Sequence, residues 1–144
     1  MNKPIRKFLL TCALLFSFPG IVSAGAGGEM TPIDLQTLVK PNPISLREAS
    51  TLVGREDITF YDVNTLEIWA DGHVPGSVYF NVKRWKRLLP ENKDATLIFY
   101  CANQLCDSSR EAAVSTMELG YTNVFHMADG IWGWRQRGYP IERP

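Results

Sequence analysis

The sequence predicts a single α/β domain in which a mostly parallel sheet is covered by helices on both faces. Short apolar runs alternate with helix-like segments between residues 45 and 137, and this alternation is typical of parallel sheets. The run Thr96–Tyr100 is uncharged and rich in β-branched and aromatic residues, as expected of a strand buried on both faces. A chain of 144 residues with 45% hydrophobic and 21% charged residues has the composition of one globular domain, which excludes disordered and collagen-like classes.

Residues 1–24 have the pattern of a secretory signal peptide. A basic start with three Lys or Arg residues precedes an apolar run over 8–18, and small residues at 22–24 form a cleavage site. An uncleaved membrane anchor is the alternative, but the apolar run is shorter than the about 20 residues that span a bilayer. We therefore expect secretion across the inner membrane into the bacterial periplasm, with residues 25–43 as an N-terminal extension and residues 44–142 as the folded domain.

Removal of the leader changes the charge of the chain. Fifteen basic residues minus the three in the leader leave 12 basic against 15 acidic residues, so the mature chain is mildly acidic, and we identify no basic run in it. Such a chain is not expected to bind nucleic acid, or the membrane once the leader is removed. Its two remaining cysteines, Cys101 and Cys106, would lie in a compartment that permits disulfides.

Caps and helix breakers set the order of the elements. Ser45 and Glu48 form a capping box that starts a helix, and Gly120 and Gly138 are suited to end two later helices in the left-handed conformation. The expected helices lie at 31–34, 45–53, 65–70, 82–89, 108–119 and 131–137, and the expected strands at 58–62, 78–80, 96–100 and 123–127.

Cys101 is the candidate nucleophile, because it directly follows the strand at 96–100 and ligands bind at the carboxyl ends of strands in such sheets. The N–H groups at the start of the next helix point back toward the loop and favour a thiolate, the reactive form of cysteine. Backbone amides of the loop are expected to surround the sulfur and to bind an anion. They belong to Ala102, Asn103, Gln104, Leu105 and Cys106.

Several short motifs together resemble the rhodanese family of single-domain sulfurtransferases. Asp62-Val63 and the segment Gly72-His73-Val74-Pro75-Gly76-Ser77 are similar to the family's D-V-R and G-H-I-P-G-A signatures, and Cys101 lies where the family places its catalytic cysteine. The segments 120–124, 129–134 and 138–141 are similar to its C-terminal pattern G-[FY]-x-x-V … G-G-I-x-x-W … G-[YL]-P. The resemblance covers roughly residues 44–142.

This resemblance implies a rhodanese-like three-layer fold with a central five-stranded sheet flanked by helices. It also implies that Cys101 takes the sulfane sulfur of a donor such as thiosulfate as a persulfide, which the loop amides stabilise. The sulfur would pass to a thiol or cyanide acceptor, including a thiol on a protein, without a cofactor. Asp62 and His73 are expected to hold loops near the site rather than to react.

The loop departs from the family in two ways. Family members that use thiosulfate carry Arg or Lys in a loop such as C-R-x-G-x-R, whereas this loop has no cation and Asp107 follows it. A second cysteine, Cys106, ends the loop, and it is either a redox partner that closes a disulfide with Cys101 or a small residue without a partner. The C-x4-C spacing, with no second pair, does not predict a metal site.

Three functions remain open at this stage. The first is the Cys101 persulfide sulfurtransferase, and the second is a thiol–disulfide redox protein that uses Cys101 and Cys106. The third is a catalytically silent module of the same fold that binds a sulfur species or a protein partner.

Overall fold

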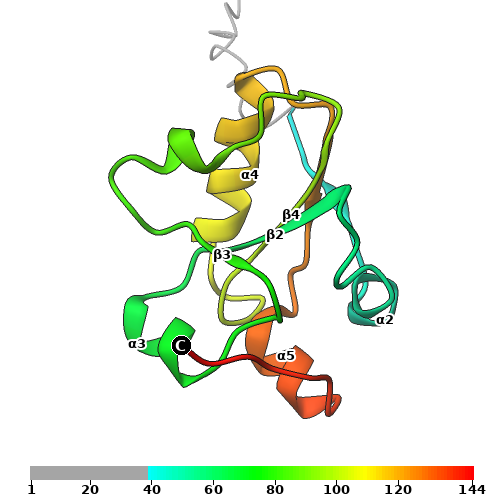
Figure 1. Cartoon of the computed structure of the whole chain (residues 1–144), viewed down its shortest axis with the longest axis vertical. Helices are drawn as coiled ribbons and strands as arrows, with labels where there is room; N and C mark the ends of the chain where they lie inside the picture. The colour runs from blue at the N-terminus through cyan, green and yellow to red at the C-terminus, as the bar shows by residue number, and fades with distance from the viewer. Residues whose placement is uncertain (1–38) are drawn as a thin grey trace, which may run out of the picture. The chain divides into compact units, whose positions relative to one another are not determined.

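The computed structural model describes residues 39–144, which form a five-stranded sheet with the strand order β1-β5-β4-β2-β3 (Figure 1). All neighbouring strands are parallel. The central strand β4 pairs along its length with β2 and β5. The strands are β1 (Asn42–Pro43), β2 (Ile58–Asp62), β3 (Val78–Tyr79), β4 (Thr96–Tyr100) and β5 (Asn123–His126).

Helices cover both faces of this sheet, which confirms the predicted three-layer α/β fold (Figure 1). On one face, α2 and α5 pack against Phe60 and Ile98. On the other face, α4 and the turn η1 pack against Leu97 and Phe99. Neighbouring residues of β4 thus enter two separate cores, so the strand is apolar throughout. The helices are α2 (Leu46–Ser50), α3 (Leu66–Asp71), α4 (Ser108–Glu118) and α5 (Gly130–Gln136), and η1 (Trp85–Leu88) is a 3-10 turn.

Two elements differ from the sequence prediction. The prediction of an α-helix at 82–89 is wrong, because only the 3-10 turn Trp85–Leu88 forms there. In an α-helix, Lys83 would lie one turn from Arg87, and like charges four residues apart destabilise helices. The strand β1 comes from the Pro-rich segment expected to precede the domain, and it pairs with β5 at the sheet edge.

The expected leader at 1–24 and the short helix at 31–34 lie outside the residues that the structure describes. Among residues 39–144, no helix is both long and apolar enough to cross a bilayer.

Candidate active site

Cys101 lies at the carboxyl end of the central strand, at the start of a loop that leads into α4. The beginning of α5 fixes this loop, because Ile131 N donates to Cys101 O (2.8 Å) and Trp132 N donates to Ala102 O (3.0 Å). Gly130 permits the approach: its φ is +61°, and a Cβ at this position would overlap the backbone of Cys101 and Ala102. Two elements distant in sequence therefore hold the backbone of Cys101.

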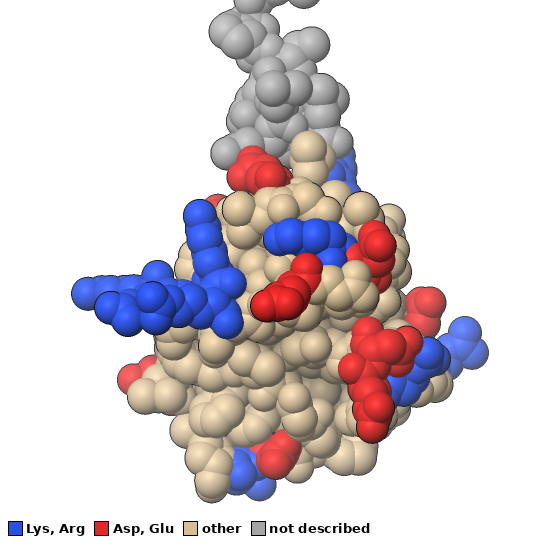
Figure 2. Space-filling view, turned by 45° about the horizontal axis from the view of Figure 1, so that its top comes forward, with Lys and Arg blue, Asp and Glu red and all other residues tan. Residues whose placement is uncertain are grey.

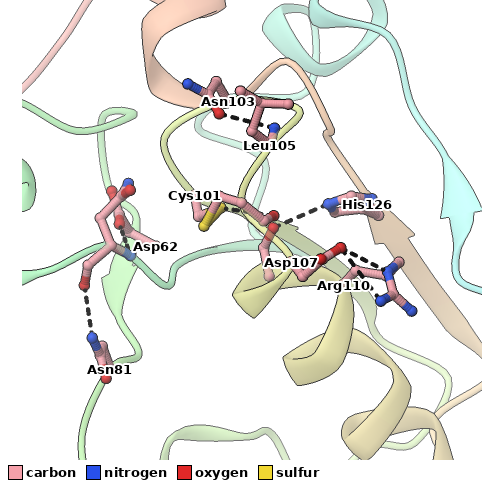
Figure 3. The surroundings of a disulfide bond; sticks show 11 residues. Asp62, Asn81, Cys101, Asn103, Leu105, Asp107, Arg110 and His126 are labelled. Carbon is pink, nitrogen blue, oxygen red and sulfur yellow. Dashed lines mark hydrogen bonds and ion pairs between the residues drawn. A yellow bond between two sulfur atoms is a disulfide. The ribbon is translucent and has the colours of Figure 1, made fainter.

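Cys101 and Cys106 are joined by a disulfide, and their Cα atoms are 6.4 Å apart (Figure 3). This separation lies within the range that disulfides span. Cys101 is buried, with 1% of its surface exposed, whereas Cys106 is half-buried. Cys106 is therefore the more exposed cysteine of the pair.

The loop amides were expected to surround the Cys101 sulfur, and two of them have other partners in the disulfide form. Leu105 N donates to Asn103 Oδ1 (2.9 Å) (Figure 3), and Cys106 N donates to Asn103 O (3.1 Å). The carbonyl oxygen of Cys106 lies 3.2 Å from the Cys101 sulfur. An amide array around this sulfur thus stays a prediction for the reduced protein.

Asp62 ends β2 beside the last residue of β4, and its side chain is fully buried. Its Oδ1 accepts a hydrogen bond from Asn64 N (2.8 Å), while Oδ2 has no hydrogen-bond partner within residues 39–144. Burial raises the pKa of the Asp62 carboxyl, and the hydrogen bond from Asn64 opposes this effect. Asp62 thus fixes the turn that follows β2, next to the strand that carries Cys101.

His73 is buried and its contacts are with α3 and the C-terminal segment. Its Nδ1 lies 2.9 Å from Trp69 O, and its ring stacks on the Trp69 indole with centroids 4.1 Å apart. Its backbone N and O both pair with Glu142, at 2.9 Å each. None of the hydrogen bonds found for His73 in the described chain reaches the Cys101 loop.

His126, at the end of β5, is a polar residue near the site that the sequence analysis did not single out. Its Nε2 lies 3.0 Å from Oγ of Ser109, a buried residue in the first turn of α4 (Figure 3). Burial lowers the pKa of His126, and the nearby Arg110 lowers it further. His126 could have been identified from the sequence by its place at the carboxyl end of a predicted strand, because ligands bind at that edge of such sheets.

The first cation after the loop along the chain is paired. Arg110 Nε lies 3.3 Å from Asp107 Oδ1 (Figure 3). No side chain of the loop itself is basic, so the surroundings of the disulfide have no unpaired positive side chain in the loop or the first turn of α4. Across residues 39–144, no group of three or more His, Cys, Asp or Glu residues is arranged to hold a metal ion.

An open groove of about 520 Å³ lies between the loop and α5. Two apolar side chains border it with large exposed fractions, 91% for Leu105 and 52% for Trp132. A hydrogen bond from Gln104 Nε2 to Asp129 Oδ1 links the loop to the start of α5 across this groove. The lining residues are Asn103, Gln104, Leu105, Asp129, Trp132, Gly133 and Gln136.

A cysteine loop between a central parallel strand and a helix defines the class of protein, an α/β protein with a cysteine pair at the carboxyl edge of its sheet. The family profile of the Rhodanese-like domain matches residues 45–137. The chain therefore belongs to the rhodanese-like family.

Relatives of known name agree with this assignment. The thiosulfate sulfurtransferase GlpE of Pseudoalteromonas translucida is 27% identical over 92 residues, which cover 63% of this chain and 86% of the relative. A sulfurtransferase of Allochromatium vinosum is 28% identical over 94 residues, covering 65% and 86%.

Solved structures share the fold at lower identity. The BH2092 protein of Bacillus halodurans superposes with a TM-score of 0.63 at 23% identity, covering 76% of this chain and 80% of that one. The rhodanese-like domain of the Anabaena protein Alr3790 gives a TM-score of 0.61 at 18% identity, covering 74% and 81%.

Proposed function

We propose that the protein is a sulfurtransferase that carries a sulfane sulfur as a persulfide on Cys101. The observation that carries the proposal is the position of Cys101, at the carboxyl end of β4 and before α4, inside the segment that matches the rhodanese-like family. The named sulfurtransferases among the relatives support the same reaction class.

The reaction has two half-steps, as expected for covalent catalysis. In the reduced protein, the Cys101 thiolate attacks the outer sulfur of a donor such as thiosulfate, and sulfite leaves with the bonding electrons. A thiol or cyanide acceptor then attacks the terminal sulfur and restores the Cys101 thiolate. Reorientation of the amides of residues 102–106 would let them stabilise the anionic persulfide.

The charge around the loop favours donors with little negative charge. Thiosulfate carries two negative charges, and the loop residues 102–106 offer it no cation. Arg110, the first one after the loop along the chain, is paired with Asp107. We therefore infer that a persulfide of a small thiol is a better donor than thiosulfate.

Cys106 allows a second reaction of the Cys101 persulfide. Its thiolate can attack the inner sulfur of the Cys101 persulfide, which forms the Cys101–Cys106 disulfide and releases hydrosulfide. This step would form the same bond that joins Cys101 and Cys106 in the structure. The same observation favours a second candidate function, a thiol–disulfide redox protein that exchanges electrons through this pair without carrying sulfur.

Export is part of the proposal and rests on the pattern of residues 1–24. An oxidising compartment would maintain the disulfide between turnovers. Cell fractionation followed by sequencing of the mature N-terminus tests this, with Gly25 as the expected first residue.

The intact mass of the protein separates the candidates. Reduced wild type, Cys101→Ser and Cys106→Ser are treated with thiosulfate or with a small persulfide, and the added mass is measured. Cys106→Ser is expected to gain one sulfur atom and to keep it, whereas Cys101→Ser gains none. Disulfide formation in the wild type with no sulfur gained by Cys106→Ser would favour the redox function. If neither product formed, a silent binding module would remain.

A further inference from the structure

Four cations gather on the turn η1 and the residues just before it. Lys83, Arg84, Lys86 and Arg87 are all exposed, and none forms an ion pair with another residue of the described chain. Figure 2 shows Lys and Arg side chains projecting together from one side of the molecule, the side on which η1 lies in Figure 1. We call this local basic surface the 83–87 surface. The net charge of the mature chain is acidic and therefore does not reveal it.

The turn η1, which carries these cations, is held against the core of the protein. The Trp85 ring packs against Phe80, with centroids 5.3 Å apart, and Lys86 Nζ lies 5.6 Å from the centre of the Trp85 ring. Tyr61 donates a hydrogen bond to Leu88 O (2.9 Å). The 83–87 surface is therefore anchored to the core at both ends of η1.

Apolar side chains and a groove accompany the charge. Val82 and Leu88 are 39% and 37% exposed on either side of the cations. A groove of about 210 Å³ adjoins them, and its lining includes Val63, Val82, Trp85, Ser108 and Glu111. Exposed apolar groups beside Arg side chains are typical of protein docking surfaces, where aromatic residues and Arg are enriched.

This groove reaches the start of α4, which follows the cysteine loop. One of its walls contains Val63, whose N–H donates to Tyr100 O (2.9 Å), the carbonyl just before Cys101. Another wall contains Ser108, two residues after Cys106. A protein seated on the 83–87 surface and along this groove would therefore reach Ser108 at the start of α4, two residues after Cys106.

We propose that the 83–87 surface docks an acidic protein whose dithiol reduces the Cys101–Cys106 disulfide. The partner's first thiolate attacks the sulfur of Cys106, the more exposed cysteine of the pair, which forms a mixed disulfide and releases Cys101 as a thiolate. The partner's second thiol then attacks the partner's first sulfur in this mixed disulfide. This step releases Cys106 as a thiolate and leaves the partner with an internal disulfide. Two electrons pass from the partner to the pair. The proposal rests on the same reactive pair as the proposed function but does not require sulfur transfer.

A protein with a local acidic patch fits better than an extended polyanion. Glu111 lines the groove beside the cations, and residues 25–144 carry 15 acidic against 12 basic groups. These charges repel a membrane surface or a nucleic acid, whereas a small acidic patch meets only the cations. Complementary charge of this kind raises association rates and is weakened by salt.

Thiol peptides of different charge test the proposal. The oxidised protein is reduced with three short cysteine peptides that differ only in flanking residues, which are Glu, Gln or Lys. Rates are measured for wild type, for Lys83→Gln/Arg84→Gln and for the quadruple variant that also carries Lys86→Gln/Arg87→Gln. The ratio of wild-type to variant rates cancels the different thiol pKa values of the peptides. Arg47→Gln/Arg137→Gln is the matched control, because both residues are exposed and lie far along the chain from η1.

At low ionic strength, the quadruple variant is expected to lose about 10-fold in rate with the Glu peptide, the double variant less, and the control pair nothing. The Lys peptide should react faster with the variants than with wild type, and about 0.5 M salt should abolish both differences. Equal ratios for all three peptides, or an equal loss in the control pair, would overturn the proposal. The proposal would also be overturned if the wild type sedimented with anionic vesicles, the quadruple variant did not, and the peptide ratios stayed equal. That result would assign the surface to a membrane. A pair resistant to every thiol would contradict the proposed chemistry of the pair itself.

Discussion

Reduction of the Cys101–Cys106 disulfide is expected to destabilise the folded protein by a modest amount that its loop length sets. The two cysteines are separated by five positions, so the crosslink removes little entropy from the unfolded chain. For a loop of this length the chain-entropy relation gives about −7 cal/mol/K, or about 2 kcal/mol at 25 °C. A larger loss would require the disulfide to support contacts beyond its own loop.

Urea unfolding with and without a reductant measures this free energy. With a slope of about 2 kcal/mol/M, the reduced protein should unfold at about 1 M lower urea. The double variant Cys101→Ser/Cys106→Ser is the control, since its midpoint should not respond to the reductant and should lie near that of the reduced wild type.

The opposite result would be informative about the site. If the reduced protein were as stable as the oxidised one, the reduced loop would gain contacts that the disulfide form lacks. Amides that now bond within the loop, such as those of Leu105 and Cys106, would be the first candidates for such contacts. The entropic account of the disulfide would then be wrong.

Three further predictions concern single side chains. Asn103→Ala removes the acceptor of Leu105 N and should cost about 0.5–1.5 kcal/mol of stability while speeding reduction of the disulfide, measured as rates with a common thiol; unchanged rates would count against a loop held by Asn103. Ile98→Ala, at a fully buried position of β4, should cost about 2–5 kcal/mol in urea unfolding, and a loss below 1 kcal/mol would contradict its core position. Burial lowers the pKa of His126, so the unfolded chain binds more protons and the free energy of unfolding should fall as the pH drops below about 6.5. His126→Gln should reduce that fall between about pH 7.5 and 5, and an identical pH dependence would argue against the lowered pKa.

Much of the fold could be predicted because its signals are local. The apolar run at Thr96–Tyr100 and the capping box at Ser45 each predict their element without tertiary information, and both elements form. The short strand β1 could not be found this way, because its two residues pair only with the edge of β5. Its Pro-rich sequence otherwise indicates a break in structure.

The site was only partly accessible from the sequence, for similar reasons. The place of Cys101 follows from its strand, but closure of the disulfide depends on a distance that spacing alone does not set. The requirement for Gly130 comes from the close approach of α5 to the loop, a tertiary contact. The 83–87 surface was overlooked because net charge averages over the whole chain, although the four cations lie within five consecutive residues of the sequence.

The central claim is that Cys101 carries the transferred sulfur, and locating that sulfur tests it most directly. Reduced Cys106→Ser is loaded with a small persulfide, alkylated, digested and analysed by tandem mass spectrometry. The account predicts the extra sulfur on Cys101, within the peptide that contains the start of α4, and its loss when cyanide or a thiol acceptor is added before alkylation. A protein that stays unloaded under these conditions, or one that keeps its sulfur in the presence of both acceptors, would contradict the claim.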